Sequence, residues 1–285
     1  MQKYDFNNNL VIIISISYLY YICLMRFTIL IMSFFCLLSC SEYQAVLKSE
    51  DPESKYVQAL EYYNNKDYSR SLSLFEQVLT AFNDRDKLEN IYYHYVYSTF
   101  HIKDYISSSY HFNNFNIKFP ASDKREEMAF MSAYCYYMQS PRYNLDQEMT
   151  HLAIEQLQLF ISTYPNSDRI NRASELILNL NKKLEKKDFE IAKSYYETGN
   201  FKSAIFAIDN FLNRFPETSY LHDLSFIQIK AYCELGQNSV EEKKEQRIKE
   251  AIFACDNFLL AFPSVNYTEE VKAMHQKLKE IQNGL

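Results

Sequence analysis

The stretch AIFAIDNFLNRFP (204–216) decides the fold, because four related stretches occur elsewhere in the chain. They read SLSLFEQVLTAFN (71–83), SSSYHFNNFNIKFP (107–120), AIEQLQLFISTYP (153–165) and AIFACDNFLLAFP (251–263). All five have apolar residues at the spacing of one helix face. Four end on an aromatic residue and a proline, which stops a helix, and Asn83 takes the place of the proline in the first stretch. The sequence therefore predicts five related helices, each followed by a turn.

A second helix is predicted upstream of each of these five, in YVQALEYYNNKDYS, YHYVYSTFHIKDYI, FMSAYCYYMQS, FEIAKSYYETGNFK and IQIKAYCELGQ. The resulting helix–turn–helix unit resembles the tetratricopeptide repeat, a pattern of about 34 residues with small, aromatic and proline positions. In the fourth repeat the matching residues are Ala192, Tyr195, Gly199, Phe201, Ala204 and Pro216. The resemblance predicts an all-α fold, a tetratricopeptide-repeat α-solenoid of five helix–turn–helix repeats wound as a right-handed superhelix.

Small residues recur where the helices of such a repeat approach closely. In the first helices they are Ala59, Val96, Ala133, Ala192 and Ala231, and in the second helices Ser71, Ser108, Ala153, Ala204 and Ala251. In the third and fifth repeats 20 residues separate the two small positions, against 12 in the fourth, which predicts an insertion of eight residues in both. Helical spacing also continues through a long segment, about 168–198, before the fourth repeat.

Composition excludes several classes of function. Only 3 of 285 residues are glycine, so no phosphate-binding glycine loop or nucleophile elbow can be written. The net charge of −6 argues against nucleic-acid binding, which needs a basic face. The basic cluster at 182–187 is interpreted as the solvated side of a helix. The six histidines form no zinc-binding spacing, and no nucleophile stands beside a base, so neither a metal site nor an enzyme is predicted.

The N-terminal region has the character of a membrane-targeting segment. Residues 10–24 and 27–39 are apolar and are separated only by Met25 and Arg26. Together they could form one transmembrane helix. Read from Met25, the sequence MRFTILIMSFFCLLSC has the plan of a secretory signal, and its end resembles the lipobox of bacterial lipoproteins. That resemblance implies cleavage before Cys40 and a covalent N-acyl and S-diacylglycerol lipid on it, with no other cofactor.

These features predict a division of the chain into four parts. They are a signal-peptide region (1–39, with a true start possible at Met25), a lipidated linker (40–54), repeats one to three (55–167), and the long helix with repeats four and five (168–285). Cys135, Cys233 and Cys255 remain after the signal region and the lipid cysteine, and we expect them to be inert thiols of the helical core and not disulfide bridges or metal ligands.

A lipoprotein of this size with five such repeats resembles the BamD family of outer-membrane β-barrel assembly lipoproteins, in a Bacteroidota-like version. The resemblance covers about residues 40–283 and is most specific in SEYQAVLKSEDPESKY (41–56) and AFMSAYCYYMQSPRYNLDQ (129–147). It implies an outer-membrane protein assembly factor that is lipid-anchored at the periplasmic face of the outer membrane. It also implies docking on the periplasmic domains of a BamA-like barrel subunit and binding of unfolded outer-membrane proteins.

The first helices line the concave face in the repeat fold, and here they are rich in aromatic residues. We predict a substrate-peptide groove of Tyr56, Tyr63, Tyr93, Tyr97, Phe100, Phe130, Tyr134 and Tyr137. The alternative is that these rings only pack helix against helix. The first insertion supplies a candidate partner contact of Ser140, Pro141, Arg142 and Tyr143, or else a packed loop. The competing functions are a generic repeat scaffold and a glycan- or cell-wall-binding lipoprotein, and the absence of Trp weighs against a sugar site.

Overall fold

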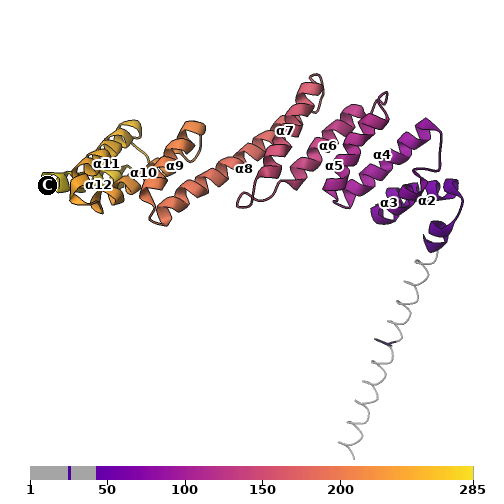
Figure 1. Ribbon diagram of the computed structural model, residues 1–285, viewed down its shortest axis with the longest axis horizontal. Helices are drawn as coiled ribbons and strands as arrows, with labels where there is room; N and C mark the ends of the chain where they lie inside the picture. Colours follow the sequence, from indigo (N-terminus) through magenta and orange to yellow (C-terminus); the bar gives the residue numbers. More distant parts are fainter. Residues whose placement is uncertain (1–24, 27–42, 285) are drawn as a thin grey trace, which may run out of the picture. The chain divides into compact units, whose positions relative to one another are not determined.

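The computed structural model describes Met25, Arg26 and residues 43–284. Within this part every regular element is a helix, as predicted (Figure 1). Residues 43–48 are helical and precede α2. The longer helices are α2 (Pro52–Asn64), α3 (Tyr68–Val78), α4 (Arg85–His101), α5 (Tyr105–Lys118), α6 (Arg125–Gln139), α7 (Glu148–Thr163), α8 (Ile170–Glu197), α9 (Phe201–Arg214), α10 (Leu221–Gln237), α11 (Glu241–Ala261) and α12 (Thr268–Asn283). The lipid-cysteine candidate Cys40 and most of the predicted signal region lie outside the described residues.

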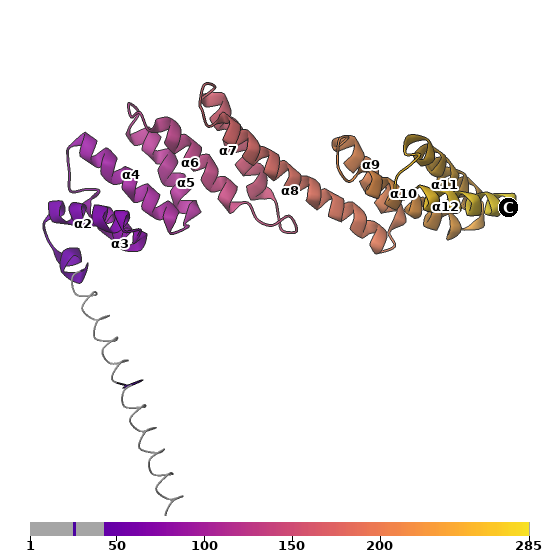
Figure 2. The ribbon, with the colours of Figure 1, turned by 180° about the vertical axis from the view of Figure 1, so that it is seen from behind.

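The helices follow one another as the pairs of a tetratricopeptide-like α-solenoid, and the fold class predicted from the repeats is confirmed (Figures 1 and 2). The chain divides into two compact units, one ending at Cys135 and the other beginning at Tyr136, within α6. In the first unit α3 packs against both α2 and α4, and α4 packs against α5. In the second unit each helix from α7 to α12 packs against the next. The sequence did not predict α12, which covers α11 at the end of the array.

The small residues lie where the repeat pattern places them. The five positions in the second helices are all completely buried, and those in the first helices are exposed by at most 3%. In the first repeat the Ser71 hydroxyl donates a hydrogen bond of 3.0 Å to the Ala59 carbonyl oxygen, which joins the two small positions directly. A larger side chain at either position would push the two helices apart. These small residues therefore fix the distance between the two helices of each repeat.

The aromatic–proline sequence ends the second helices in the same way in four repeats. Phe119, Tyr164, Phe215 and Phe262 each have φ between −121° and −132° and ψ between 64° and 68°, which leaves the helical region before the proline. In the first repeat, where Asn83 replaces the proline, α3 ends earlier, at Val78. Thr80, Asn83 and Arg85 then line a cavity of about 510 Å³ beside the ends of α3 and α5.

The two predicted insertions have different structures although they have the same length. In the third repeat, residues 140–147 form a loop between α6 and α7. In the fifth, the added residues are helical and extend α11 toward its N-terminus. The sequence EEKKEQRIKE (241–250) consists of good helix formers and has supporting pairs such as Glu245 with Lys249, at 2.7 Å, whereas Pro141 interrupts a helix in the third repeat. The long helix predicted over about 168–198 is confirmed as α8.

In the first, second and fourth repeats the turn between the paired helices contains a left-handed residue, and of these three only the fourth has glycine there. Gly199 has φ of 76°, and the equivalent Lys66 and Lys103 have φ of 62° and 67°. A left-handed conformation costs an ordinary L-residue about 1–2 kcal/mol, and glycine avoids this cost. The first two repeats therefore carry a local strain that the fourth does not.

We predict that Lys103→Gly stabilises the protein. The backbone strain removed from the folded state is larger than the free-energy cost of glycine's greater conformational freedom in the unfolded chain. We therefore expect the free energy of unfolding, measured with urea, to rise by about 0.5–1 kcal/mol. The reverse change, Gly199→Ala, should cost a similar amount, because a Cβ there meets no atom within 4 Å and only the backbone angle is penalised. A loss of stability in Lys103→Gly would contradict the assignment.

Candidate functional site

Seven of the eight predicted groove residues lie in the first unit, on three successive first helices. We call this set the aromatic face: Tyr56 and Tyr63 on α2, Tyr93, Tyr97 and Phe100 on α4, and Phe130 and Tyr134 on α6. All seven are half-buried. One side of each ring therefore packs against the protein while part of it stays open to solvent, so the two readings made from the sequence, packing and binding, are compatible. Tyr137, the eighth residue, belongs to the second unit and is also half-buried.

Helix α2 contacts α4 through the aromatic face. The Tyr56 hydroxyl donates to Oδ1 of Asn90 at 3.1 Å. Tyr63 meets the His94 ring edge-on, with centroids 4.8 Å apart, and also meets Tyr68 at 5.4 Å. Burial raises the pKa of Tyr63 to about 12, so its hydroxyl stays protonated at neutral pH. This part of the face therefore presents uncharged rings.

Helix α4 contacts α6 through one carboxylate. Glu127 Oε1 accepts a hydrogen bond of 3.1 Å from the Tyr93 hydroxyl and a second, short one from the Tyr97 hydroxyl. Burial, followed by the hydrogen bond to Glu127, raises the pKa of Tyr97 well above its usual range. Two further ring contacts follow. The ring centroids of Phe100 and Tyr134 are 6.2 Å apart, and Tyr134 stacks on Phe130 with a centroid distance of 6.1 Å. With His94 and His101 between them, the rings from Tyr63 to Phe130 form a continuous row across α2, α4 and α6, while the Tyr56 ring packs against Phe82.

The polar contacts in this row repeat with the period of the fold. Tyr56 to Asn90 and Tyr93 to Glu127 each span 34 residues, and each joins a first helix to the next first helix. Tyr56 and Tyr93 occupy the same position in successive repeats, and so do Asn90 and Glu127. The sequence analysis did not identify Glu127. A signal was present, because 127, 130, 134 and 137 follow the 3–4 spacing of one helix face.

Two histidines complete the aromatic face without adding charge. Burial lowers the pKa of both His94 and His101, so both rings are neutral at neutral pH. His101 stacks on Tyr68 with centroids 4.1 Å apart, and His94 Nδ1 lies 2.8 Å from the Asn90 carbonyl oxygen. Both rings pack between α2 and α4, where each contacts Tyr63. The chemistry that the face offers is ring stacking and apolar contact.

The insertion in the third repeat is a loop with fixed ends and an exposed centre. Ser140 binds the Thr150 hydroxyl at 2.6 Å, and Gln147 Nε2 donates to the Arg142 carbonyl oxygen at 2.8 Å. Lys183 Nζ binds Ser140 Oγ at 2.7 Å, so the insertion is tied to α8. Arg142 and Tyr143 remain exposed, while Ser140 and Pro141 are half-buried. The loop is therefore packed at its base and open at its tip.

The basic cluster on α8 was predicted to be only a solvated face, and this is wrong for two of its lysines. Besides the Lys183 contact, Lys187 Nζ binds the Leu145 carbonyl oxygen at 2.6 Å. Partial burial against the loop lowers the pKa of Lys183. The physical reason is that the inserted loop leaves carbonyl groups without helical partners, and long lysine side chains can reach them.

A cavity of about 680 Å³ lies beside this loop within the second unit. It carries charges of both signs, from Asp146, Glu148, Lys187, Asp188 and Arg214, above the apolar side chains Ile154, Leu184 and Phe215. Arg214 forms an ion pair with Asp188 at the edge of the cavity. The repeat pattern does not predict this cavity, because its lining combines side chains of the inserted loop with others from α7, α8 and α9.

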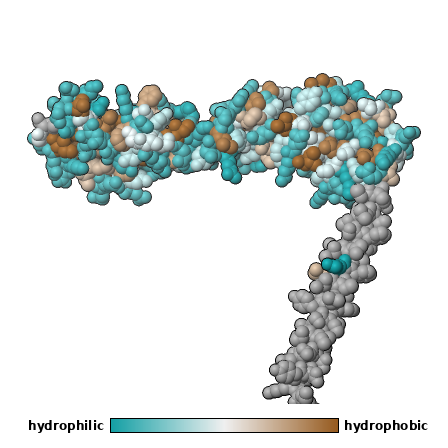
Figure 3. Space-filling model, turned by 60° about the horizontal axis from the view of Figure 1, so that its bottom comes forward, coloured by the Kyte–Doolittle hydropathy of each residue, from teal (hydrophilic) through white to brown (hydrophobic). Residues whose placement is uncertain are grey.

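The described residues meet the requirements of neither a metal site nor a membrane-spanning helix. In residues 43–284, together with 25–26, no three His, Cys, Asp or Glu side chains are placed to hold a metal ion. None of the helices in the same part of the chain has both the length and the apolar character needed to span a bilayer. The face visible in Figure 3 carries apolar residues as separate spots among polar ones on each unit.

Comparison with known proteins gives a family. The chain matches the sequence profile of the YfiO family, described as outer membrane lipoprotein, over residues 48–247 and 190–284. A curated relative, the putative outer membrane protein assembly factor BamD of Aquifex aeolicus (strain VF5), is 25% identical over 203 residues. The match covers 67% of this chain and 66% of the relative, so it spans just under two thirds of the relative's length.

Solved structures with repeat folds are also similar to the chain. The TPR2AB domain of yeast Sti1 in its pHSP90 complex is 10% identical, and the match covers 80% of this chain and 98% of that domain, with a TM-score of 0.38. A TPR repeats protein from Bacteroides fragilis NCTC 9343 is 14% identical and covers 82% of this chain and 100% of its own, with a TM-score of 0.35.

Proposed function

The chain belongs to the YfiO family of outer membrane lipoproteins, and on this premise we propose that it is a lipid-anchored subunit of the β-barrel assembly machinery. In this role its first three repeats bind segments of unfolded barrel proteins, and its second unit docks on the barrel subunit. The curated relative, a putative outer membrane protein assembly factor, supports the general role. The observation that carries the proposal for substrate binding is the continuous row of half-buried rings across α2, α4 and α6.

The aromatic face suits an extended peptide with apolar side chains. Rings on adjacent helices repeat along the face, so a peptide lying across the helices meets a new ring at each repeat. The strands of outer-membrane barrels alternate apolar and polar residues, and their lipid-facing side is apolar and aromatic near the membrane surfaces. Neutral His94 and His101 add no positive charge to the face, on which Lys87 and Lys124 already lie over the rings of Tyr56 and Tyr93. The face therefore matches the apolar side of an unfolded barrel strand.

We predict that Tyr97→Ala combined with Phe100→Ala weakens binding of a peptide from the C-terminal strand of a barrel protein. Removing two adjacent rings from the centre of the face should lower the affinity by at least about tenfold, or about 1.4 kcal/mol. Isothermal titration calorimetry with purified protein measures this, and circular dichroism verifies that each variant is folded.

The matched control changes two exposed residues of α5 in the same unit, Tyr110→Ala with Ile117→Ala. Their side chains are 64% and 69% exposed and lie on a second helix, so this pair should leave peptide affinity unchanged. Phe130→Ala, on α6, is a milder test of the face and should weaken binding several-fold. Unaltered affinity in a folded Tyr97 and Phe100 double variant would refute the proposed groove.

The second unit is proposed to dock on periplasmic domains of a BamA-like barrel subunit through the tip of the inserted loop. The exposed side chains Arg142 and Tyr143 belong to a loop whose Asp146 and Gln147 line a cavity with charges of both signs, which suits a folded partner with complementary charges. Lys183 and Lys187 hold the loop in position, so the contact surface is preformed.

A photo-crosslinking amino acid at position 143 should capture the barrel subunit in intact cells. The same amino acid at Tyr195, which is exposed to a similar extent on α8, serves as the control and should not. Equal capture of the barrel subunit at both positions, or none at position 143, would argue against this docking surface.

Anchoring is proposed to occur through a lipid on Cys40. Replacement of this cysteine removes the only sulfur at the end of the lipobox-like sequence, so Cys40→Ala should abolish incorporation of a labelled fatty acid and release the protein from the membrane fraction. Cys135→Ala, which changes a cysteine of the described helical core, should retain both properties. Labelling that persists in Cys40→Ala would reject the assignment.

A further inference from the structure

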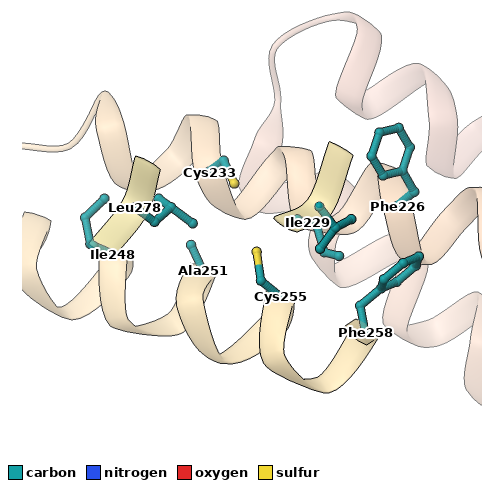
Figure 4. Packing of buried hydrophobic residues seen from close by; sticks show 9 residues of the cluster. Phe226, Ile229, Cys233, Ile248, Ala251, Cys255, Phe258 and Leu278 are labelled. Atoms are coloured by element: carbon teal, nitrogen blue, oxygen red, sulfur yellow. The ribbon is translucent and has the colours of Figure 1, made fainter. Parts of the chain in front are cut away.

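Two of the buried cysteines lie together in the core of the last repeat. Cys233 on α10 and Cys255 on α11 belong to one apolar cluster, with Ile229, Ile248 and Ala251 around them (Figure 4). Cys233 is 5% exposed and Cys255 is completely buried. Both thiols are free, and they lie close enough together to shift each other's pKa. From the sequence these residues are predicted to be inert core thiols, because the repeat pattern does not show which positions of different helices meet.

The packing of the two helices directs the sulfur atoms toward each other. Helices α10 and α11 are antiparallel neighbours, joined by the short segment 238–240. They approach closely at Gly236, where a Cβ would lie 3.0 Å from Cδ1 of Ile248. Side chains lean toward the N-terminus of their own helix, so in an antiparallel pair Cys233 leans toward the level of Cys255, and Cys255 toward that of Cys233. In Figure 4 both sulfur atoms point into the same part of the core.

The cellular compartment in which outer membrane lipoproteins reside favours oxidation of such a pair of thiols. An outer membrane lipoprotein lies at the periplasmic or the outer surface, and both are oxidising environments in which disulfides form and persist. Two thiols in one cluster on adjacent packed helices are placed where a disulfide can link the helices. The interaction with the Cys255 thiol lowers the pKa of Cys233, so Cys233 is the sulfur that ionises first.

We propose that Cys233 and Cys255 form a disulfide that links α10 to α11 in the mature protein. The oxidant is a disulfide donor of the compartment, either a disulfide-bonded oxidoreductase or a small-molecule disulfide. The Cys233 thiolate attacks one donor sulfur and releases the other as a thiolate, and Cys255 then attacks the mixed disulfide and releases the second. The two cysteines lose two protons and two electrons, and the donor disulfide is reduced to two thiols. Because both sulfurs are buried, the exchange takes place before α12 packs over the pair.

Mass spectrometry of the protein isolated from membranes decides the proposal. Cells are treated with an alkylating agent at lysis, and the protein is denatured and digested with trypsin without reduction. Cleavage after Lys230, Lys243, Lys249 and Lys272 places the two cysteines in separate peptides, 231–243 and 250–272. We expect to recover them as one linked species, two hydrogens lighter than their sum, which reduction separates. Recovery of the two peptides separately, each alkylated, would overturn the proposal.

A thermal measurement provides the second readout. Closing this short loop restricts the unfolded chain, so reduction should lower the midpoint of thermal unfolding by on the order of 5–10 °C. Cys233→Ala should unfold at the same temperature with and without reductant, whereas Cys135→Ser should keep the difference shown by the natural chain. An unchanged midpoint on reduction of the natural chain would overturn the proposal as well.

Discussion

The close approach of paired helices at their small residues is the contact on which the rest of the structure depends. Ser71 bonded to the Ala59 carbonyl oxygen, and its buried equivalents in the later repeats, set the distance between the two helices of each repeat. That distance fixes the step from one first helix to the next, because each second helix separates two of them. A bulky residue here would disturb every contact that recurs across the first helices, including Tyr56 with Asn90 and Tyr93 with Glu127.

The aromatic face follows from this spacing, and its half-buried state has a functional meaning. A row of fully buried rings would be core only, and a row of fully exposed rings would be an aggregation hazard. Here the protein's own contacts hold one side of each ring, so a ligand would meet side chains whose positions are already fixed. These side chains then lose their rotamer entropy when the protein folds, so binding a ligand does not carry that cost.

Much of the fold could be predicted from the sequence because the same local pattern of residues recurs in every repeat. The aromatic–proline ends, the small positions and the long helix α8 all follow from short-range preferences that the chain repeats. The details that escaped prediction depend on side chains from separate helices. Glu127 receives two hydroxyl groups from α4, Lys183 and Lys187 reach across to the inserted loop, and Cys233 meets Cys255. The two insertions have the same length, and length alone does not show that one is a loop and the other extends a helix.

The hydrogen bonds of Tyr56, Tyr93 and Tyr97 have a further consequence for selectivity. Each of these hydroxyl protons is already donated to Asn90 or Glu127, so a chain bound as proposed would meet aromatic surface and find these three donors occupied. Such a surface would select its ligands by the spacing of their apolar residues and not by the identity of each one. A receptor of this kind can accept many sequences that share one pattern, while it passes over polar chains of the same length.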